Sequence, residues 1–391
     1  MGGREYQMKV VHIFKDCYPP TTGGIEQHMS LLCRRLAQSV DVAILAPSRS
    51  RARIDERLAG VRIVRMPEFG RFASVPLCPT APWELRRLRP DLVHLHFPNP
   101  MGDYAQFLGG AGAPFVLTYH ADIIKQKAFL PLYRPVQRTL FRRARMIIFS
   151  AHENIPPSFS EYQFKCRVIP FGVEPEAFDL NDQEIAGVEE LRRSSGSPIV
   201  LFVGAARYYK GIQILLQAMA KVRGCLILAG RGTDDDSLRR LAGEVGAGGT
   251  VRFCGEVSAS RLRILMQAAD IFVLPSINAC ETFGICQLEA MACSKPVVST
   301  DLPTGVRSVN RQGITGLVVP PGEPDALAEA LSVLASNPGL RAEFGKAGRR
   351  RVEQEFSAGR MVSKTLEVYR EVFEGSSKNR DARAGNAEAR F

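Results

Sequence analysis

The chain has 391 residues, which is more than one ordinary hydrophobic core organises and suits two domains of comparable size. Hydrophobic residues make up 45% of the chain and charged residues 23%, a composition that excludes disordered and fibrous proteins. The formal net charge of +11 favours an anionic partner, which could be nucleic acid, anionic lipid or a phosphorylated small molecule.

The basic residues form scattered local clusters, such as Arg142-Arg143 and Arg349 to Arg351, rather than one block. We interpret these clusters first as solvated helix faces and second as a peripheral contact with an anionic membrane surface. No pattern of interleaved aromatic and basic residues is present, so nucleic-acid binding is disfavoured.

The cysteines and the apolar segments indicate the cellular compartment in which the protein lies. There are nine cysteines, an odd number, without a CxxC pair, which indicates a reducing environment and argues against a zinc site or a disulfide framework. The first residues lead straight into a strand-like run without a secretory signal pattern, and no stretch has the length of a membrane span. We therefore expect a cytoplasmic protein, with peripheral contact at the inner face of the cell membrane as a further expectation.

From Met8 onward, short apolar runs alternate with longer amphipathic segments. Near-continuous apolar runs of this length suit a parallel sheet that is covered on both faces. The amphipathic segments, such as 25–38, have apolar residues at helical spacing. The expected strands of the first half are 10–14, 40–47, 61–66, 92–97, 115–121, 146–151 and 167–173.

The second half repeats the pattern after a polar segment, 179–197, which ends in a stretch rich in Ser and Gly and is the best linker candidate. The strands expected there are 198–206, 224–230, 250–256, 271–276, 295–300 and 316–322. The succession predicts an α/β protein with two Rossmann-like, doubly wound parallel-sheet domains that face a cleft.

We place the first domain at 1–180 and the second at 181–375. The last strong helix, about 360–373, is a candidate to pack back on the first domain. The remaining residues, 376–391, have almost nothing to bury, so we expect a disordered tail.

Two stretches of the first half carry candidate site residues. Gly23 and Gly24 lie in a turn between the first strand and a helix, where backbone amides and the helix N-terminus favour an anion, although a plain strand-to-helix turn explains them nearly as well. His120 falls at the carboxyl end of a strand, where an imidazole could bind a sugar hydroxyl or could be structural. His94 and His96 have a spacing found in metal sites, but without a nearby carboxylate or cysteine we assign them a structural role.

The stretch LFVGAARYYKG, residues 201–211, ends a buried strand and at once presents Arg207 and Lys210 before a helix. Fixed cations beside a helix N-terminus would bind a diphosphate, whereas two exposed cations on a surface loop are the alternative.

The most specific signal is Glu281, followed by Glu289 eight residues later, after the apolar run 271–274. We expect Glu281 in the loop and Glu289 inside the following helix. Carboxylates near a helix start would repel a bound phosphate, so we expect them to have another role. That role is to accept hydrogen bonds from the adjacent hydroxyl groups of a ribose and of a sugar.

These stretches resemble the glycosyltransferases of family 4, which retain the configuration of the transferred sugar and have the GT-B fold. The resemblance is carried by YKG, ETFGICQLEAMAC, KPVVSTDLPTG and TGLVVPPGEPDALAEAL, and more weakly by YPPTTGGIEQH, LTYHAD and VIPFGV. It covers most of the chain up to about residue 375.

The resemblance implies a role for each matching position. Gly24, with its neighbour Gly23, would face the donor diphosphate or the acceptor, and His120 would contact the transferred sugar near its reacting carbon. Lys210, aided by Arg207, would neutralise the leaving diphosphate. Glu281 would hold sugar hydroxyls and Glu289 the ribose hydroxyls, while the amides of Phe283 and Gly284 would donate to the phosphate. The family needs no metal ion and no cofactor beyond the nucleotide sugar, which is a substrate.

One position departs from the family pattern. An arginine usually follows the glycine that ends the strand, but this chain has Ala205 there. Losing one cation of a diphosphate site could cost about 2–4 kcal/mol of transition-state stabilisation. Arg207, two residues on, is the candidate replacement. Ser294, where the family often has glycine, is a milder departure.

The resulting interpretation is a retaining hexosyltransferase that acts on a lipid-linked glycan or polysaccharide acceptor, as in lipopolysaccharide assembly. The blocks LPTGV and HADIIKQK resemble those of bacterial mannosyltransferases that use GDP-mannose, and this resemblance implies mannose as the transferred sugar. Two alternatives stay open. One is a weakened or non-catalytic nucleotide-sugar-binding homologue, suggested by Ala205, and the other is a sugar-nucleotide epimerase or hydrolase on the same fold.

Overall fold

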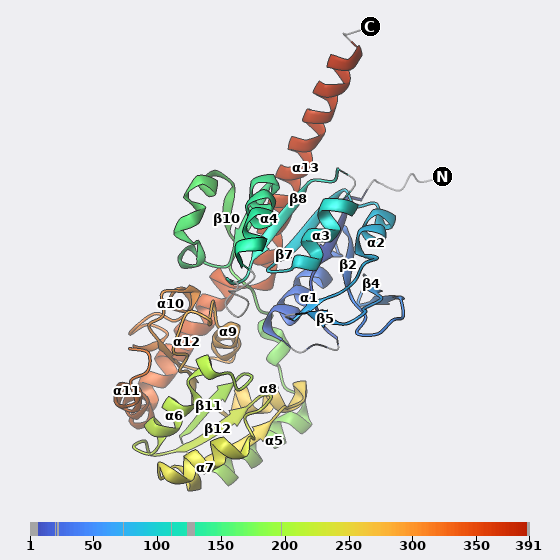
Figure 1. Ribbon diagram of the computed structural model, residues 1–391. Helices are drawn as coiled ribbons and strands as arrows, with labels where there is room; N and C mark the ends of the chain where they lie inside the picture. The colour runs from blue at the N-terminus through green and yellow to red at the C-terminus, as the bar shows by residue number, and fades with distance from the viewer. Residues whose placement is uncertain are drawn as a thin grey trace. The chain divides into compact units, whose positions relative to one another are not determined.

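The computed structural model describes residues 7–19, 21, 23–72, 74–110, 112–122, 130–196 and 198–388. It separates into two compact units (Figure 1). Unit 1 consists of Met1–Pro170 together with Ala358–Phe391, and unit 2 consists of Phe171–Ser357. The first boundary therefore lies at Pro170 rather than at residue 180, and the end of the chain belongs to unit 1.

Unit 1 contains an eight-stranded sheet in the order β10-β9-β8-β7-β1-β2-β4-β3. Its strands are β1 (Lys9–Ile13), β2 (Asp41–Pro47), β3 (Ile54–Leu58), β4 (Val61–Met66), β7 (Leu92–Phe97), β8 (Phe115–Tyr119), β9 (Met146–Phe149) and β10 (Cys166–Val168). Strand β3 pairs antiparallel with β4, and the other neighbours pair in parallel. The strand order reverses between β1 and β7, so polar groups that follow these strands share one edge of the sheet.

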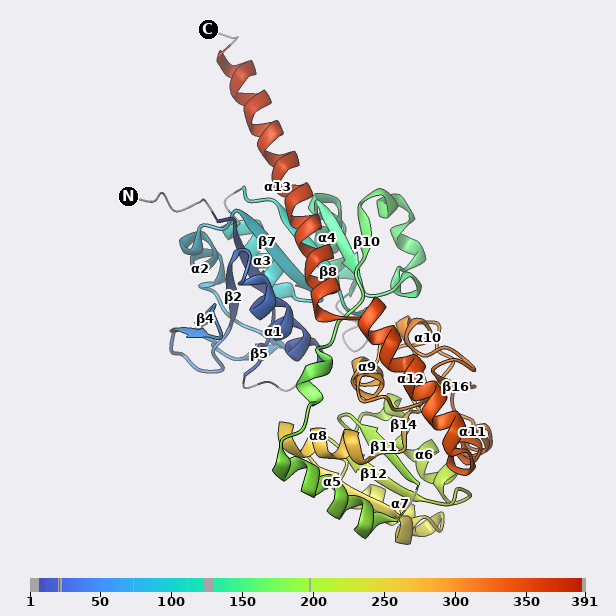
Figure 2. The same cartoon turned by 180° about the vertical axis from the view of Figure 1, so that it is seen from behind.

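Helices cover both faces of this sheet, as the two opposite views show (Figures 1 and 2). They are α1 (Gly24–Leu36), α2 (Ala81–Leu88), α3 (Pro100–Gly109), α4 (Leu130–Arg143) and α13 (Ala358–Glu388), with 3-10 helices at His152–Asn154 and Pro157–Lys165 and a small hairpin of β5 (Arg71–Phe72) and β6 (Val75–Pro76). One core, rich in aromatic residues, lies under α2, α3 and α4. The other core lies under α1 and α13 and includes the fully buried Tyr369.

Unit 2 is built on a six-stranded sheet in the order β13-β12-β11-β14-β15-β16, parallel throughout. Its strands are β11 (Ile199–Val203), β12 (Cys225–Ala229), β13 (Val251–Gly255), β14 (Ile271–Leu274), β15 (Val297–Thr300) and β16 (Gly316–Val319). Its α-helices are α5 (Asp182–Ser195), α6 (Ile212–Met219), α7 (Asp236–Glu244), α8 (Ala259–Ala268), α9 (Ile285–Ala292), α10 (Gly305–Val309), α11 (Pro324–Ser336) and α12 (Pro338–Glu355). Three 3-10 helices complete it, Pro175–Phe178, Tyr208–Lys210 and Gly248–Thr250.

The structure corrects the expected linker at 179–197. Most of this segment is helix α5, which belongs to unit 2 and begins with a capping box between Asn181 and Glu184. The Glu184 carboxylate also accepts hydrogen bonds from Ser260 Oγ at 2.6 Å and Arg263 Nε at 3.0 Å, both on α8. The polar composition that suggested a linker is that of a capped surface helix.

The end of the chain also differs from the expected disordered tail. Helix α13 continues to Glu388, so the backbone is helical over most of 376–391 (Figure 2). The commonest residues there are Ala and Arg, and both are compatible with a helix even without an apolar face. The packed part of α13 lies before this extension, where Met361, Val368 and Val372 join the core of unit 1.

Candidate active site

In unit 2, the turn after β11 places Lys210 at the carboxyl end of the sheet. Gly211, the next residue, has a φ of +68°, and a Cβ there would overlap the carbonyl oxygen of Pro275, which follows β14. Only glycine satisfies both the left-handed backbone and this close approach. The Lys210 side chain runs back over Gly204, where its Nζ would lie 3.6 Å from a Cβ. The YKG turn therefore aims the lysine across the end of its own strand.

Lys210 and Glu281 form an ion pair in this position. Lys210 Nζ lies 2.5 Å from Glu281 Oε2, and the two side chains are only 12% and 10% exposed. Burial disfavours the ammonium form, but the adjacent Glu281 carboxylate outweighs it and raises the pKa of Lys210. The lysine is therefore a fixed positive charge at neutral pH.

Two hydroxyl groups hold Glu281 in place. Ser276 Oγ donates to Glu281 Oε2 at 3.0 Å, and Thr304 Oγ1 donates to the Glu281 backbone carbonyl at 2.8 Å. Both hydroxyls are buried. The sequence reasoning missed them, although Ser276 is the last residue of an expected strand, and strand ends are the place where polar side chains serve a site.

Helix α9 begins beside this pair. Its N-cap, Gly284, has a φ of +71°, and no side chain caps the helix, so the first amides are presented by backbone alone. Phe283 is buried against Phe171 with ring centroids 5.0 Å apart, which anchors the start of the helix. Glu289 lies within α9, as expected, and burial raises its pKa to about 7 despite the opposing effect of Lys210.

The candidate replacement for the missing arginine is exposed. Arg207 precedes the 3-10 turn that carries Lys210, and Ala205 is half-buried. Among the residues that the structure describes, Arg207 has no ion-pair partner. Its charge is therefore available on the surface of the turn, but the ion pair with Glu281 belongs to Lys210 alone.

In unit 1, His120 follows β8 and is almost completely buried. Its Nε2 lies 2.9 Å from His96 Nδ1, and His96 Nε2 lies 3.0 Å from His12 Nδ1. His96 comes from β7 and His12 from β1, the strands at which the sheet order reverses. Burial lowers the pKa of His12 to about 3 and that of His96 and His120 well below the usual value, so these imidazoles are neutral.

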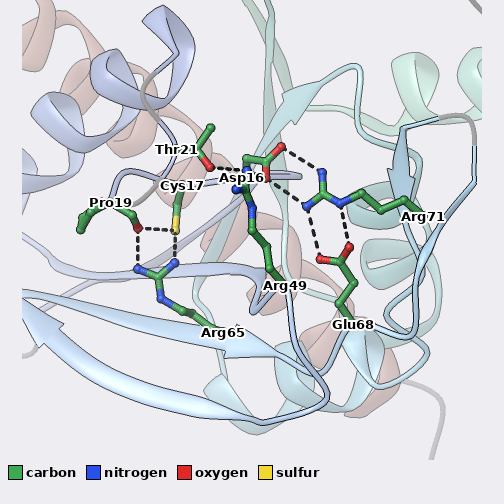
Figure 3. Close-up of polar contacts among 8 residues, drawn as sticks. All are labelled: Asp16, Cys17, Pro19, Thr21, Arg49, Arg65, Glu68 and Arg71. Atoms are coloured by element: carbon green, nitrogen blue, oxygen red, sulfur yellow. Dashed lines mark hydrogen bonds and ion pairs between the residues drawn. The ribbon is translucent and has the colours of Figure 1, made fainter. Parts of the chain in front are cut away.

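The loop after β1 is held by arginines from neighbouring segments (Figure 3). Arg65, on β4, donates to the Pro19 carbonyl at 2.7 Å and to Cys17 Sγ at 3.0 Å. Arg49 donates to Asp16 at 3.1 Å and Thr21 at 2.8 Å. These contacts fix the approach of the chain to α1.

At the start of α1, the Glu26 carboxylate folds over Gly23, where a Cβ would overlap Glu26 Oε2. Burial raises the pKa of Glu26, and the N-cap residue Gly23 offers no side chain to cap the helix. A carboxylate of the protein itself thus lies beside Gly23. The assignment of Gly23 and Gly24 to a phosphate or an acceptor stays a prediction.

Two family models of known proteins match the two halves of the chain separately. Residues 22–177 match the model of Glycosyltransferase Family 4, and residues 187–351 match that of Glycosyl transferases group 1. The chain belongs to this glycosyltransferase family. It is similar to O-antigen chain mannosyltransferase C of Escherichia coli, with 32% identity over 95% of this chain and all of the relative. It is also similar to D-rhamnosyltransferase WbpZ of Pseudomonas aeruginosa, with 32% identity over 90% of this chain and 93% of the relative.

Solved structures confirm the expected fold of this glycosyltransferase. Sucrose-phosphate synthase from Thermosynechococcus elongatus superposes with a TM-score of 0.77 at 22% identity, covering 94% of this chain and 100% of that one. Both sequence expectations, family 4 and the two parallel-sheet domains of the GT-B fold, are therefore confirmed.

The glycosyltransferase thus carries its candidate residues in two groups. Lys210, Glu281, Phe283, Gly284 and Glu289 lie around the ends of β11 and β14 in unit 2. Gly23, Gly24 and His120 belong to unit 1, in the segments that follow β1 and β8.

The histidine pair that we interpreted as structural is part of a larger group. Nitrogens of His12, His94 and His96 lie within 4.8 Å of one another, close enough for a metal ion. Each residue also has hydrogen-bond partners here, since His94 contacts Tyr369 Oη at 2.5 Å and Thr118 Oγ1 at 2.6 Å. None of these partners is a carboxylate, the group that commonly accompanies metal-bound imidazoles. Sequence reasoning missed the link to Tyr369, which lies 275 residues from His94.

Proposed function

We propose that this glycosyltransferase is a retaining hexosyltransferase that uses GDP-mannose and extends a lipid-linked glycan or polysaccharide. The buried Lys210–Glu281 ion pair is the observation that carries the proposal, because it supplies a permanent positive charge for a diphosphate leaving group. The mannosyltransferase among its relatives, which is named for the O-antigen chain, supports the sugar and the acceptor class.

In the proposed reaction, the bond between the sugar C1 and the diphosphate oxygen breaks while the acceptor oxygen bonds to C1 from the same face. The acceptor proton passes to a leaving diphosphate oxygen. Lys210 and the amides at the start of α9 stabilise the negative charge that develops on that leaving group, and these groups act without a metal ion.

The remaining residues bind and orient the donor. Glu281 and Glu289 accept hydrogen bonds from sugar and ribose hydroxyls. Because Glu289 has a pKa of about 7, its hydrogen bonding to a ribose depends on the proton it carries. Arg207 adds a second positive charge in place of the arginine that Ala205 replaces.

Two exposed apolar residues support contact with the inner face of the cell membrane. Trp83 on α2 is 69% exposed and Leu108 on α3 is 58% exposed, and Arg86 and Arg87 lie on the same helix as Trp83. A cationic surface with protruding aromatic and aliphatic side chains suits anionic lipid. Within the described residues, no helix is long and apolar enough to cross a membrane.

The first experiment measures thermal stabilisation by GDP, UDP, ADP and dTDP, because a ligand that binds the native state raises its apparent stability. We expect GDP to raise the transition most. Failure of all four nucleotides would overturn the nucleotide-sugar assignment. Transfer is then measured from radiolabelled GDP-mannose to a lipid extract, with the anomeric configuration of the product determined by NMR.

The same assay separates the alternatives. Release of free mannose or conversion of the donor without an acceptor would indicate a hydrolase or an epimerase. Binding without turnover, unchanged in Ala205→Arg, would favour the non-catalytic homologue that Ala205 suggests.

A further inference from the structure

Arg351, on α12, is a buried cation of unit 2 that has no part in the reaction proposed above. Its side chain is only 8% exposed. Its guanidinium donates to the backbone carbonyl of Ser308 at 2.8 Å and to that of Val309, both at the C-terminal end of α10. It also donates to the two carboxylate oxygens of Glu355, at 3.1 Å each. The arginine therefore has its charge paired and holds the end of a neighbouring helix.

The other end of α10 holds a residue of the candidate site. Thr304, the N-cap residue of α10, donates through Oγ1 to the Glu281 backbone carbonyl at 2.8 Å. A helix of five residues is not stable by itself, so tertiary contacts determine its position. Arg351 supplies such contacts at the end where the last carbonyls lack partners within the helix and attract a cation. Arg351 thus helps to fix the hydroxyl group that holds Glu281.

A second line of contacts leads from Arg351 to the start of α9. The guanidinium carbon lies 5.0 Å from the centre of the Phe356 ring, a distance typical of a cation–π contact. The Phe356 ring packs edge-on against the Phe283 ring, with centroids 6.2 Å apart. Both rings are buried, and Phe283 directly precedes Gly284, the N-cap of α9. Because protein interiors are close-packed, a displaced Phe356 ring would displace the first amides of α9.

Both lines of contact end at the same short stretch of chain. The first reaches Glu281 through α10, and the second reaches Phe283, two residues further along. This stretch carries the carboxylate that pairs with Lys210 and leads into the first amides of α9. A planar guanidinium can donate to several oxygens and cover an aromatic ring at once, which an ammonium group cannot.

We propose that Arg351 is a positioning residue for the donor site. Through α10 it holds Glu281, and through Phe356 it holds Phe283 and the first amides of α9. The contacts of Glu281 and of these amides with the donor rest on the proposed function. The two lines of contact do not, because they are formed without a ligand.

The test variant is Arg351→Met, which keeps an unbranched apolar stem and removes the guanidinium. The matched control is Arg341→Met, on the same helix. Arg341 donates to the carbonyls of Leu334 at 2.7 Å and Ala335 at 2.9 Å, near the end of α11. It therefore holds the end of α11 as Arg351 holds the end of α10, but α11 carries none of the candidate residues.

The ligand-free arm is hydrogen exchange of the full chain, measured by mass spectrometry. In Arg351→Met, peptides that cover 281–288 should exchange about tenfold faster, because their local opening no longer breaks the contacts with α10 and Phe356. In Arg341→Met, these peptides should match the wild type, and peptides from 324–336 should exchange faster. Unchanged exchange at 281–288 in Arg351→Met would overturn the positioning role.

The functional arm measures steady-state transfer from GDP-mannose and the dissociation constant of GDP. Misplacement of binding groups by about 1 Å can cost 10²-fold in rate, so kcat should fall about 10²-fold in Arg351→Met. Loss of one well-placed hydrogen bond to the diphosphate should weaken GDP binding about tenfold. Arg341→Met should match the wild type in both quantities. Equal losses in the two variants would reduce the effect to general destabilisation and overturn the proposal.

Three milder variants keep the proposal testable if Arg351→Met does not fold. Thr304→Val removes the hydroxyl that holds Glu281, and Phe356→Leu removes the ring that Arg351 covers. Arg351→Lys keeps the charge and loses the planar fork. Each should lower transfer, and combining Arg351→Lys with either of the others should cost less than the product of the single effects. Independent effects, or full activity of Arg351→Lys, would show that Arg351 does not act through these contacts.

The two arms separate the positioning role from the proposed function. Faster exchange at 281–288 together with unchanged transfer and GDP binding would show that this stretch does not depend on Arg351 for its work at the donor site, and would overturn the proposal. If the wild type neither binds GDP nor transfers mannose, the proposed function fails. The exchange result then decides by itself whether Arg351 positions Glu281 and the start of α9.

Discussion

The two units share an architecture and differ in the side chains that follow their central strands. Both are parallel sheets covered by helices, and both place candidate residues after their central strands. All six histidines of the chain belong to unit 1, and unit 2 has none. Unit 1 therefore presents neutral imidazoles, while unit 2 presents a lysine held charged by a glutamate. The same fold can support hydrogen bonding to sugars at one edge and stabilisation of a diphosphate at the other.

The largest expected effect tests the charge in unit 2. Lys210→Met should reduce transfer about 10²–10³-fold, because a developing charge loses its fixed partner in a nearly dry position. Steady-state transfer from labelled GDP-mannose measures it. The matched control is Lys221→Met, whose ion pair with Asp325 is exposed and far weaker in effect. Equal losses in both variants would show that the position of the charge is irrelevant.

The second prediction is that a fall in pH changes the folding stability of the two units in opposite directions. His12 has a pKa of about 3 in the folded state against 6.5 unfolded, so the unfolded state binds the extra proton between these values. The contribution of His12 to the stability of unit 1 is fully present above its unfolded pKa of 6.5 and falls as the pH drops, by about 1.4 kcal/mol per pH unit for each such histidine. Asp103, whose burial raises its pKa to about 7, offsets one of them.

Unit 2 should respond in the opposite direction through Glu289. Its folded-state pKa of about 7 exceeds the unfolded value of 4.5, so acidification from pH 7 toward 4.5 stabilises the folded state. Hydrogen exchange measured by mass spectrometry at about pH 7.5 and about pH 5.5, corrected for intrinsic rates, resolves the two units. Parallel destabilisation of both would contradict the comparison.

A smaller effect is expected from restoring a cation to the turn of unit 2. Ala205→Arg should increase transfer or tighten GDP binding about tenfold, because it returns the charge that the family usually has there. Arg207→Ala should reduce the same quantities in the wild type and have little effect in the Ala205→Arg background. Titration calorimetry with GDP on the single and double variants measures this coupling. Additive effects would show that Arg207 does not replace the missing arginine.

The smallest expected effect is on the stability of the protein, through the end of the helix that carries Glu289. Ser294, just after α9, has a φ of 55°, a left-handed conformation that glycine adopts without strain. Helix α1 of unit 1 ends at Leu36, and its C-cap Ala37 has a right-handed conformation, so no comparable gain is available there. Ser294→Gly should stabilise the protein by about 0.5–1 kcal/mol in urea unfolding, and Ala37→Gly should destabilise it. A loss in Ser294→Gly would mean that the serine has a further contact.

Sequence reasoning worked best where a local pattern carries the information. The apolar runs located most of the main strands closely, because a strand buried on both faces must be apolar throughout. It missed β3, whose residues Ile54–Leu58 are exposed and largely charged. The segment 179–197 was wrongly expected as a linker, because its helix is stabilised by the contacts of Glu184 with α8, which composition does not show.

Some residues of the candidate site could likewise be predicted from a local pattern, and others could not. The YKG turn and Glu281 are adjacent to strand ends and could be found from the sequence, and the structure pairs them. The histidine chain could not be found, since it joins residues 12, 96, 120 and 369 by tertiary packing alone. The expectation that His94 and His96 are structural was right about their burial and left out Tyr369, with which His94 makes a hydrogen bond.

The return of α13 to unit 1 has a consequence for biosynthesis. Unit 2 is inserted within unit 1 along the chain, between Pro170 and Ala358. As the protein leaves the ribosome, unit 2 is complete while one core of unit 1 still lacks Met361, Val368, Tyr369 and Val372. Domains generally fold as units during synthesis. This core of unit 1 is therefore completed only by the last helix, and a message truncated before residue 358 would yield a finished unit 2 attached to a unit 1 that lacks part of this core.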